Sequence, residues 1–335
     1  MAYVPKFLIT PRLLSEIEQV AALRERIQSS VVDLAWIPSL QKDTRARNGH
    51  ASTAIEGNPL TLDQVRALEE GRELSAPETR HRREVLNYFA GLRYVEKNAA
   101  KKTFHHADIL ELHRILAAEV MDQGEAGKYR TIGVRVGRYS PPAADAVSGL
   151  MSELLEWWNS ASNKLSPVLS SAILHYRFEA IHPFADVNGR TGRMLALWEL
   201  YRRGFDTHHI FSVDEYYWED RPKYYAALDG VRKSGENLSF WLEYCAAGLR
   251  QTLERAWLRM KAFQVTSKQR LVLRPRQEKL LHLLRDHGSM VPGEIWKALG
   301  VSRQGAMDLL RPLIDAGLVE KVGGKKTGYY ALRKP

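Results

Sequence analysis

Cysteine is almost absent from this chain, which has only Cys245 among its 335 residues. An internal disulfide needs two cysteines, so none can form, and a reducing compartment suits the protein. Long apolar runs are also missing, because no segment approaches the roughly 18 apolar residues that indicate a membrane-spanning helix. The N-terminal stretch MAYVPKFLIT lacks the basic start and the apolar core of a signal peptide. We therefore expect a cytoplasmic protein that does not cross a membrane.

Acidic residues are scarce only towards the C-terminal end. From Thr266 to Pro335 the sequence holds 14 Lys and Arg against 6 Asp and Glu, whereas the first 265 residues hold 35 against 33. Most of the net charge of +10 therefore belongs to the C-terminal part. A concentrated basic domain is typical of nucleic-acid binding, although a solvated basic surface accounts for the same charge.

Helical periodicity dominates the first 264 residues. Apolar residues recur three to four positions apart, and Gly and Pro fall between the segments. Thr61 followed by Gln64 predicts a capping box at the start of one helix. The chain shows no internal repeat. We expect a mainly α fold, with helices over residues 11–36, 40–55, 61–68, 78–97, 106–122, 144–160, 166–180 and 190–203 and further helices as far as residue 264.

One stretch before residue 265 has the periodicity of a strand. In GKYRTIGVRVGRYSPP, residues 127–142, Ile132, Val134 and Val136 alternate with polar residues or glycine. Two prolines then end the run, because proline cannot donate to a strand ladder. We therefore predict a β-hairpin here, which would serve either as a flap or as an edge strand.

The basic C-terminal part has a different order of elements. RPRQEKLLHLLRDHG and VPGEIWKALG predict two helices, and RQGAMDLLRPLIDAG predicts a third that Ser302 can cap. LVEKVGGKKTGYYAL predicts a hairpin that turns at Gly323 and Gly324. Pro312 should kink or end the third helix. Three helices followed by a hairpin resemble the winged helix-turn-helix family.

The segment HPFADVNGRTGR, residues 182–193, gathers polar groups of several kinds on one loop. The helix before it should end at His182, and a new helix should begin near Arg190, so free N–H groups meet there and favour an anion. Arg190 and Arg193 lie one turn apart and can bind phosphate oxygens. Asp186 offers an oxygen ligand for Mg²⁺, and His182 titrates near neutrality as a general base would. Each residue alone also has a structural explanation, but their joint spacing predicts a site for a Mg²⁺-bound polyphosphate.

This segment resembles the signature of the Fic family, His-Pro-Phe-x-Asp/Glu-Gly-Asn-Gly-Arg-x-x-Arg, and matches it at every specified position except one. The resemblance extends over most of the first 250 residues. It implies an N-terminal helical region with an inhibitory helix at residues 1–100, a Fic catalytic core at 101–264 and a winged helix at 265–335. It also implies an enzyme that transfers AMP from ATP to Ser, Thr or Tyr hydroxyls of target proteins and of itself.

The resemblance further implies a role for individual residues. His182 would deprotonate the acceptor hydroxyl, and Asp186 would hold Mg²⁺. The predicted hairpin would be the flap over the nucleotide, and an extended segment of the target protein would add along the edge of the flap. Tyr224 and Tyr225 would lie near the adenine, although core packing explains them equally well. The residues implied for ATP binding are Val134, Arg135, Val136, Gly137, Asp186, Val187, Asn188, Gly189, Arg190, Thr191, Gly192, Arg193, Tyr224 and Tyr225.

The stretch STAIEG, residues 52–57, resembles an inhibitory motif of the same family. In the class that carries this motif in an N-terminal helix, its glutamate pairs with the second arginine of the signature. The resemblance therefore implies that Glu56 pairs with Arg193. An arginine held by a carboxylate cannot also bind the γ-phosphate, so ATP would bind in a non-productive pose. The alternative is a glutamate near a helix end with no partner.

Val187 is the single departure from the signature, which has glycine there. Glycine is needed where φ is positive or where a phosphate approaches too closely for a Cβ, and a β-branched residue adopts a positive φ only at a cost. We expect Val187 to have an ordinary φ and to point away from the phosphates. The alternative is a deformed loop with low activity.

Two other functions remain open from the sequence. The first is a DNA-binding regulator in which the Fic core senses nucleotide without efficient catalysis. The second is a Fic enzyme that transfers phosphate or another nucleotide. The winged helix could instead bind protein or mediate a homodimer. Possible DNA contacts are Arg303, Gln304, Arg311, Lys325 and Lys326.

Overall fold

The computed structural model describes residues 3–30, 37–72, 79–205, 209–265, 273–324 and 328–333. The chain forms two compact units. Unit 1 comprises residues 1–30 and 41–253, and unit 2 comprises residues 31–40 and 254–335. The described residues are mainly helical with one small sheet, which confirms the predicted mainly α fold. None of the helices that the structure describes is long and apolar enough to span a membrane.

Unit 1 is built from helices. Two of them begin at side-chain caps: Thr10 accepts the N–H of Leu13 at 3.1 Å, and the capping box of Thr61 and Gln64 is confirmed. The helices that lie wholly or mainly in this unit are α1 (Pro11–Gln28), α2 (Ile37–Ile55), α3 (Leu62–Glu69), α4 (Arg80–Lys97), α5 (His106–Leu116), α6 (Val147–Asn159), α7 (Pro167–Ile181), α8 (Asn188–Arg202), α9 (Val213–Glu219), α10 (Arg221–Lys233) and α11 (Ser239–Val265).

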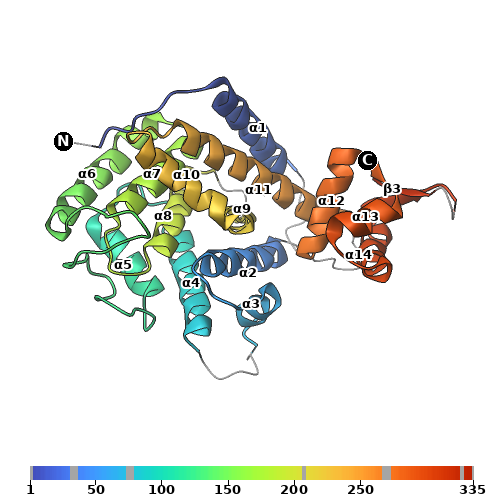
Figure 1. Ribbon diagram of the computed structural model, residues 1–335, viewed down its shortest axis with the longest axis horizontal. Coiled ribbons are helices and arrows are strands. Elements are labelled where there is room, and N and C mark those ends of the chain that lie inside the picture. The colour runs from blue at the N-terminus through green and yellow to red at the C-terminus, as the bar shows by residue number, and fades with distance from the viewer. Residues whose placement is uncertain are drawn as a thin grey trace. The chain divides into compact units, whose positions relative to one another are not determined.

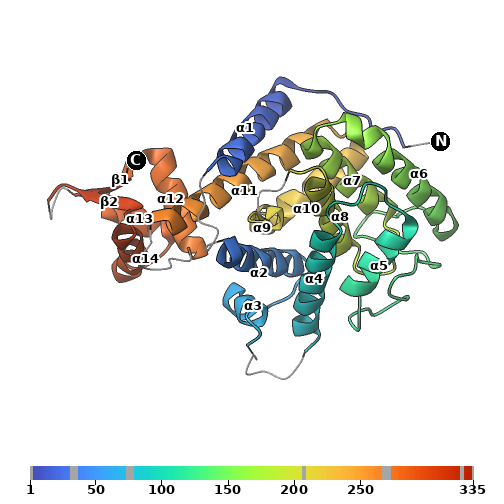
Figure 2. The ribbon, with the colours of Figure 1, turned by 180° about the vertical axis from the view of Figure 1, so that it is seen from behind.

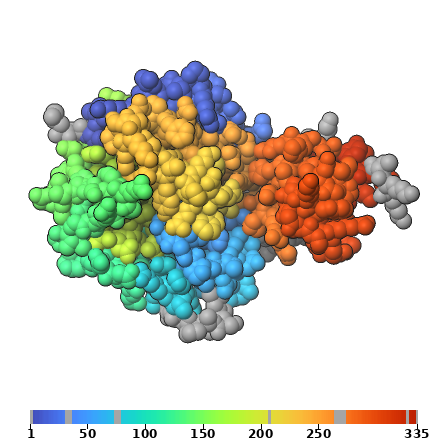
Figure 3. Space-filling model, in the orientation of Figure 1, coloured from blue at the N-terminus to red at the C-terminus, as the bar shows by residue number. Residues whose placement is uncertain are grey.

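Helices α7 and α8 form the centre of unit 1 and lie against each other (Figure 1). Helix α6 packs on α7, while α4 and α5 pack on α8 (Figure 2). Nearly every residue of α7 is buried, which explains why its apolar residues follow no single face. On the face drawn in Figure 3, N-terminal residues, α6 and the α9–α11 region supply much of the surface of unit 1. The loop between α7 and α8 therefore starts and ends on fully packed elements.

The predicted β-hairpin at residues 127–142 is wrong in its extent. Only an isolated bridge joins Val136 to Tyr139, through two backbone hydrogen bonds of 2.9 Å. The buried guanidinium of Arg130 accounts for the difference, because it donates to the carbonyl of Ile132 at 3.1 Å and to that of Pro142 at 2.5 Å. These carbonyls are therefore bonded to a side chain rather than to a neighbouring strand. We call residues 131–142 the flap.

Unit 2 has its own core and sheet. Its elements are α12 (Pro275–His287), β1 (Ser289–Met290), α13 (Pro292–Leu299), α14 (Arg303–Asp315), β2 (Val319–Val322) and β3 (Tyr329–Leu332). The antiparallel sheet has the order β1-β3-β2, and Leu280, Ile295 and Leu310 belong to the core beside it. This order of elements is what a winged helix requires, and the assignment stays a prediction.

Two details of unit 2 concern the sequence predictions. Ser302 caps α14 by accepting the N–H of Gly305 at 3.1 Å. Pro312 does not end this helix, which continues to Asp315, since proline removes only one N–H from the ladder. Lys325 and Lys326 lie outside the described residues.

Candidate active site

The loop between α7 and α8 is held by its own side chains and by α5. Asn188 closes it, because its amide accepts the N–H of Phe184 at 2.9 Å and donates to the carbonyl of the same residue at 2.8 Å. Phe184 is buried and stacks on the imidazole of His113 with ring centroids 3.6 Å apart. His113 Nε2 also lies 3.1 Å from the carbonyl oxygen of Asp186. These contacts fix the backbone of the loop independently of any bound molecule.

Val187 does not have the ordinary φ that we expected. Its φ is +63° and its ψ is 17°, which is the left-handed region, and its side chain is buried. The conformation is imposed by its neighbours: the N–H of Val187 donates to Asp186 Oδ1 at 2.6 Å, and its carbonyl accepts from Thr191 Oγ1 at 2.8 Å. A β-branched residue in this region is strained, and such strain persists only where the surroundings determine it.

His182 is the residue at the other end of the loop and is left-handed too, with a φ of +51°. Burial, with the nearby charges of Arg130 and Arg232, lowers the pKa of His182 to about 4. Its imidazole is therefore neutral at physiological pH and can accept a proton. Nδ1 has no hydrogen-bond partner among the described residues, and the nearest carboxylate oxygen, Oε2 of Glu179, is 3.8 Å away.

The N-terminus of α8 offers free backbone donors. In the part of the chain that the structure describes, no group accepts the N–H of Asn188, Gly189 or Arg190. These N–H groups and the positive end of the helix dipole together favour an anion. Thr191 and Gly192 follow them within α8 and are buried.

Asp186 borders this anion site. Its Oδ1 accepts the N–H of Val187, while the guanidinium of Arg80 lies 3.8 Å from Oδ2. No group of three His, Cys, Asp or Glu in the described residues is arranged to hold a metal ion. A single carboxylate beside an anion site fits Mg²⁺, which usually takes one or two carboxylates together with substrate phosphates.

The two arginines of the loop are engaged differently. Arg190 is buried, its Nη1 is 3.4 Å from Oε1 of Glu84, and both Nε and Nη1 lack a hydrogen-bond partner among the described residues. Arg193 is held by three hydrogen bonds: Nη2 donates to Glu56 Oε1 at 2.8 Å and to the Ser52 carbonyl at 2.9 Å, and Nε donates to Ser52 Oγ at 3.0 Å. Arg190 thus keeps unbonded N–H groups beside Glu84, whereas Arg193 is held by α2.

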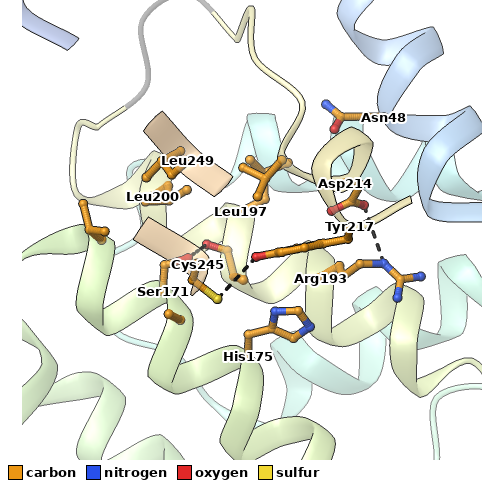
Figure 4. A pocket seen from close by; sticks show the side chains of 14 residues that line it. Asn48, Ser171, His175, Arg193, Leu197, Leu200, Asp214, Tyr217, Cys245 and Leu249 are labelled. Atoms are coloured by element: carbon orange, nitrogen blue, oxygen red, sulfur yellow. Dashed lines mark hydrogen bonds and ion pairs between the residues drawn. The ribbon is translucent and has the colours of Figure 1, made fainter. Parts of the chain in front are cut away.

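Behind Arg193 lies a small cavity within unit 1, lined by His175, Asp214, Tyr217 and Cys245 among others (Figure 4). Asp214 Oδ2 is 3.7 Å from Nε of Arg193, so this guanidinium faces a second carboxylate. Burial lowers the pKa of His175 to about 3, so the cavity contains no histidine cation. The side of Arg193 away from Glu56 is therefore also fixed by packing.

The paired tyrosines of α10 are placed differently from each other. Tyr224 is buried, stacks on Tyr217 at 4.8 Å and hydrogen-bonds with Nε2 of His175 at 3.0 Å, so it is part of the core. Tyr225 is 37% exposed, and the guanidinium of Arg221 lies 5.4 Å from its ring centroid. An adenine contact of Tyr225 stays a prediction, whereas that of Tyr224 would need this core to open.

The flap is tied to the loop at its base. Nε of Arg130 donates to the carbonyl of His182 at 2.8 Å, and the N–H of Arg130 donates to that of Pro183 at 2.9 Å. Arg130 therefore holds the backbone of His182 and the flap in one arrangement. The residues predicted to cover the nucleotide are exposed or half-buried in the flap, and they are Val134, Arg135, Val136 and Gly137.

Several residues at this site were missed by the sequence analysis. Glu179 precedes His182 by three positions, so the helical period could have placed both on one face of α7. Ser52 lies in the STAIEG stretch that had already been singled out. Arg130, Glu84 and Asp214 carried no signal, because only the tertiary fold brings them to the loop.

Comparison with known proteins adds independent information. A model of the Fic/DOC family matches residues 103–200. Among curated proteins, the protein adenylyltransferase fic-1 of Caenorhabditis briggsae is 38% identical over 182 residues, which is 53% of this chain and 34% of that protein. The protein of the same name from Caenorhabditis elegans is 37% identical over 224 residues, 62% of this chain and 43% of that protein. The chain thus spans less than half the length of either relative.

Solved structures also resemble this chain. A Fic family protein from Desulfovibrio desulfuricans G20 has a TM-score of 0.67 and 27% identity, with 98% of each chain covered. Fic-1 from Caenorhabditis elegans has a TM-score of 0.65 and 28% identity, with 74% of this chain and 73% of that chain covered. Both similarities agree with the helical architecture of unit 1.

Proposed function

We propose that this chain, which contains a Fic domain, transfers AMP from ATP to Ser, Thr or Tyr hydroxyls of target proteins and of itself. The observation that carries the proposal is the loop between α7 and α8. It brings a neutral imidazole, a carboxylate, three unpaired backbone donors and the unbonded N–H groups of Arg190 to one place. The names of the curated relatives support the same activity.

Each group has a task in this reaction. His182 accepts the proton of the target hydroxyl, whose oxygen attacks the α-phosphorus of ATP. The bond from that phosphorus to the oxygen bridging to the β-phosphate breaks, and pyrophosphate leaves. The N–H groups at the start of α8 and Arg190 bind the phosphates, since phosphoryl-type transfer depends mainly on positioning and charge neutralisation. Mg²⁺ held by Asp186 would neutralise negative charge on the leaving group.

We also propose that Glu56 restrains this activity. Arg193 is buried between Glu56, Ser52 and Asp214, and its Nε and Nη2 are already bonded, so these donors are not free to bind a γ-phosphate. The carboxylate of Glu56 also lies over Gly189, where a side chain would collide with it. The γ-phosphate and Glu56 therefore compete for the same space and the same guanidinium. Removal of Glu56 should free both.

A labelling assay with three variants tests the proposal. Glu56→Gly should raise the transfer of label from ATP to the protein itself and to proteins of a cell lysate, and adding His182→Ala should abolish it. Glu70→Gly is a matched control, because Glu70 is an exposed glutamate at the C-terminal end of α3 that pairs with Arg72 at the surface. Labelling that is equal in the wild type and the Glu56 variant would refute the restraint.

For unit 2 we propose an interaction role in which DNA is one candidate partner. Arg303, Gln304 and Arg311 are exposed on α14, as DNA contacts require. Gln304, however, donates to Asp308 at 2.8 Å, and Asp308 follows it on the same face. A face of mixed charge suits a protein partner, a second copy included. DNA binding would weaken steeply with added salt and with Arg311→Ala, whereas a protein contact would not require that dependence.

A further inference from the structure

Two polar groups at the C-terminal end of α7, Glu179 within the helix and His182 just after it, face each other without being bonded. Glu179 and His182 lie one turn apart, and their side chains are 9% and 16% exposed. Oε1 of Glu179 and Nδ1 of His182 both lack a hydrogen-bond partner among the described residues. Oε2 of Glu179 is 3.8 Å from that Nδ1. Buried polar atoms are rarely left unpaired, so this pair calls for an explanation in the chemistry of the site.

Helix α8 makes room for this carboxylate at Gly192. A Cβ at that position would lie 2.5 Å from Oε1 of Glu179 and 3.0 Å from Cδ1 of Phe178. Glycine at residue 192 therefore lets the carboxylate occupy the space between α7 and α8. The Fic signature does not specify this position, so the space that Gly192 leaves for Glu179 is a feature of the packing in this chain.

We propose that Glu179 is a positioning residue, which orients the imidazole of His182 by accepting the proton on Nδ1. This leaves the lone pair of Nε2 free to take the proton of the target hydroxyl. A closure of about 1 Å would form the hydrogen bond, and such bonds are often long before substrate binds. The carboxylate would also stabilise the imidazolium that forms, as the buried aspartate does in serine proteases. The effect of Glu179 on catalysis rests on the proposed AMP transfer. The contact between Glu179 and the imidazole of His182 does not depend on that function.

The protonation state of Glu179 then controls the base. When the carboxyl is protonated, its O–H donates to Nδ1, so the imidazole proton lies on Nε2, which cannot act as the base. Burial raises the pKa of Glu179 to about 7, and the charges that face it are Arg193 and Arg232, which lower its pKa, and Glu56, which raises it. Transfer should therefore increase as the pH rises through the neutral range.

The main-chain carbonyl of Glu179 is a competing acceptor. It faces the imidazole too, and it raises the pKa of His182. The two acceptors make different predictions, because a carbonyl cannot titrate and is unchanged by a side-chain substitution. Only the carboxylate couples the tautomer of His182 to pH.

Nitrogen NMR of labelled histidine tests the inference without any assay of activity. The His182 signals are identified as those lost in His182→Ala. In the wild type we expect the proton to move from Nε2 to Nδ1 as the pH is raised from about 5 to about 9, and we expect Glu179→Gln to remove this change. Glu153→Gln is the control, because Glu153 lies 4.0 Å from Arg177 of α7 without contacting His182. An unchanging tautomer in the wild type would overturn the proposal even if the variant fails to fold.

The catalytic consequence is measured in the Glu56→Gly background. Adding Glu179→Gln should lower transfer about 100-fold, the size typical of general-base effects, and should remove its rise with pH. Transfer that stays the same in rate and pH profile would overturn the catalytic role of Glu179. A tautomer that depends on Glu179 in a protein with no transfer at all would instead refute the AMP transfer and leave the positioning contact standing.

Discussion

Replacing Val187 by glycine and by alanine tests the strained loop directly. Both variants lose the two buried methyl groups of valine, a loss of about 1.5 kcal/mol that cancels when the variants are compared. What remains is the difference between glycine and alanine at a φ of +63°. Alanine in the left-handed region costs about 1–2 kcal/mol. Glycine costs about 0.5–1 kcal/mol more than alanine in the entropy lost on folding. Glycine also lacks the buried Cβ that alanine keeps, which costs about 0.8 kcal/mol more.

At this φ the cost of alanine and the two costs of glycine nearly cancel. Val187→Gly should therefore be about as stable as Val187→Ala, whereas at an ordinary φ it would be less stable by about 1.5 kcal/mol. Urea unfolding followed by tryptophan fluorescence measures the difference, because Trp157, Trp158 and Trp198 are fully buried in unit 1. The two variants should have similar midpoints and share one slope. An alanine variant more stable than the glycine variant by about 1.5 kcal/mol would refute the left-handed assignment.

Three further perturbations follow from the site. Without nucleotide, Glu56→Gln should lower the free energy of unfolding by about 1–2 kcal/mol, because a third of the Glu56 side chain is exposed and the Glu56–Arg193 ion pair is therefore only partly buried. Mg²⁺-ATP should raise the melting temperature of this variant more than that of the wild type. Arg130→Met should cost about 3 kcal/mol in urea unfolding, because it leaves three carbonyls of the flap and loop without their charged donor. Glu179, with a pKa raised from 4.5 to about 7, contributes stability at low pH that is lost as the pH rises through about 7. Glu179→Gln should therefore gain stability relative to the wild type as the pH rises from 5 to 8. A difference in unfolding free energy between the two proteins that does not change with pH would contradict the burial of that carboxyl.

The helical body was predictable because its signals are local. Caps such as Thr61 with Gln64 and the apolar period of each helix depend on residues within one or two turns. Pairing of Glu56 with Arg193 was also implied in advance, through the resemblance of a short motif. The contact is present at 2.8 Å, although its effect on activity is still a proposal.

The loop and the flap were predicted less well because distant residues decide them. Val187 was expected to follow its own preference, yet contacts of Asp186 and Thr191 with its backbone impose the left-handed conformation. The alternation at residues 131–136 favoured a strand, but the guanidinium of Arg130 bonds to carbonyls that a ladder would need. Burial of a carboxylate such as Glu179 cannot be read from its residue type, because glutamate is usually exposed.

The reaction itself is tested most directly by the position of the transferred label. The Glu56→Gly protein is incubated with Mg²⁺ and with ATP labelled either in the α-phosphate or in the γ-phosphate. AMP transfer predicts stable label on the protein from α-labelled ATP alone, with none in the His182→Ala double variant. Label from γ-labelled ATP would show phosphate transfer instead, and the absence of label from both would contradict catalysis by this loop.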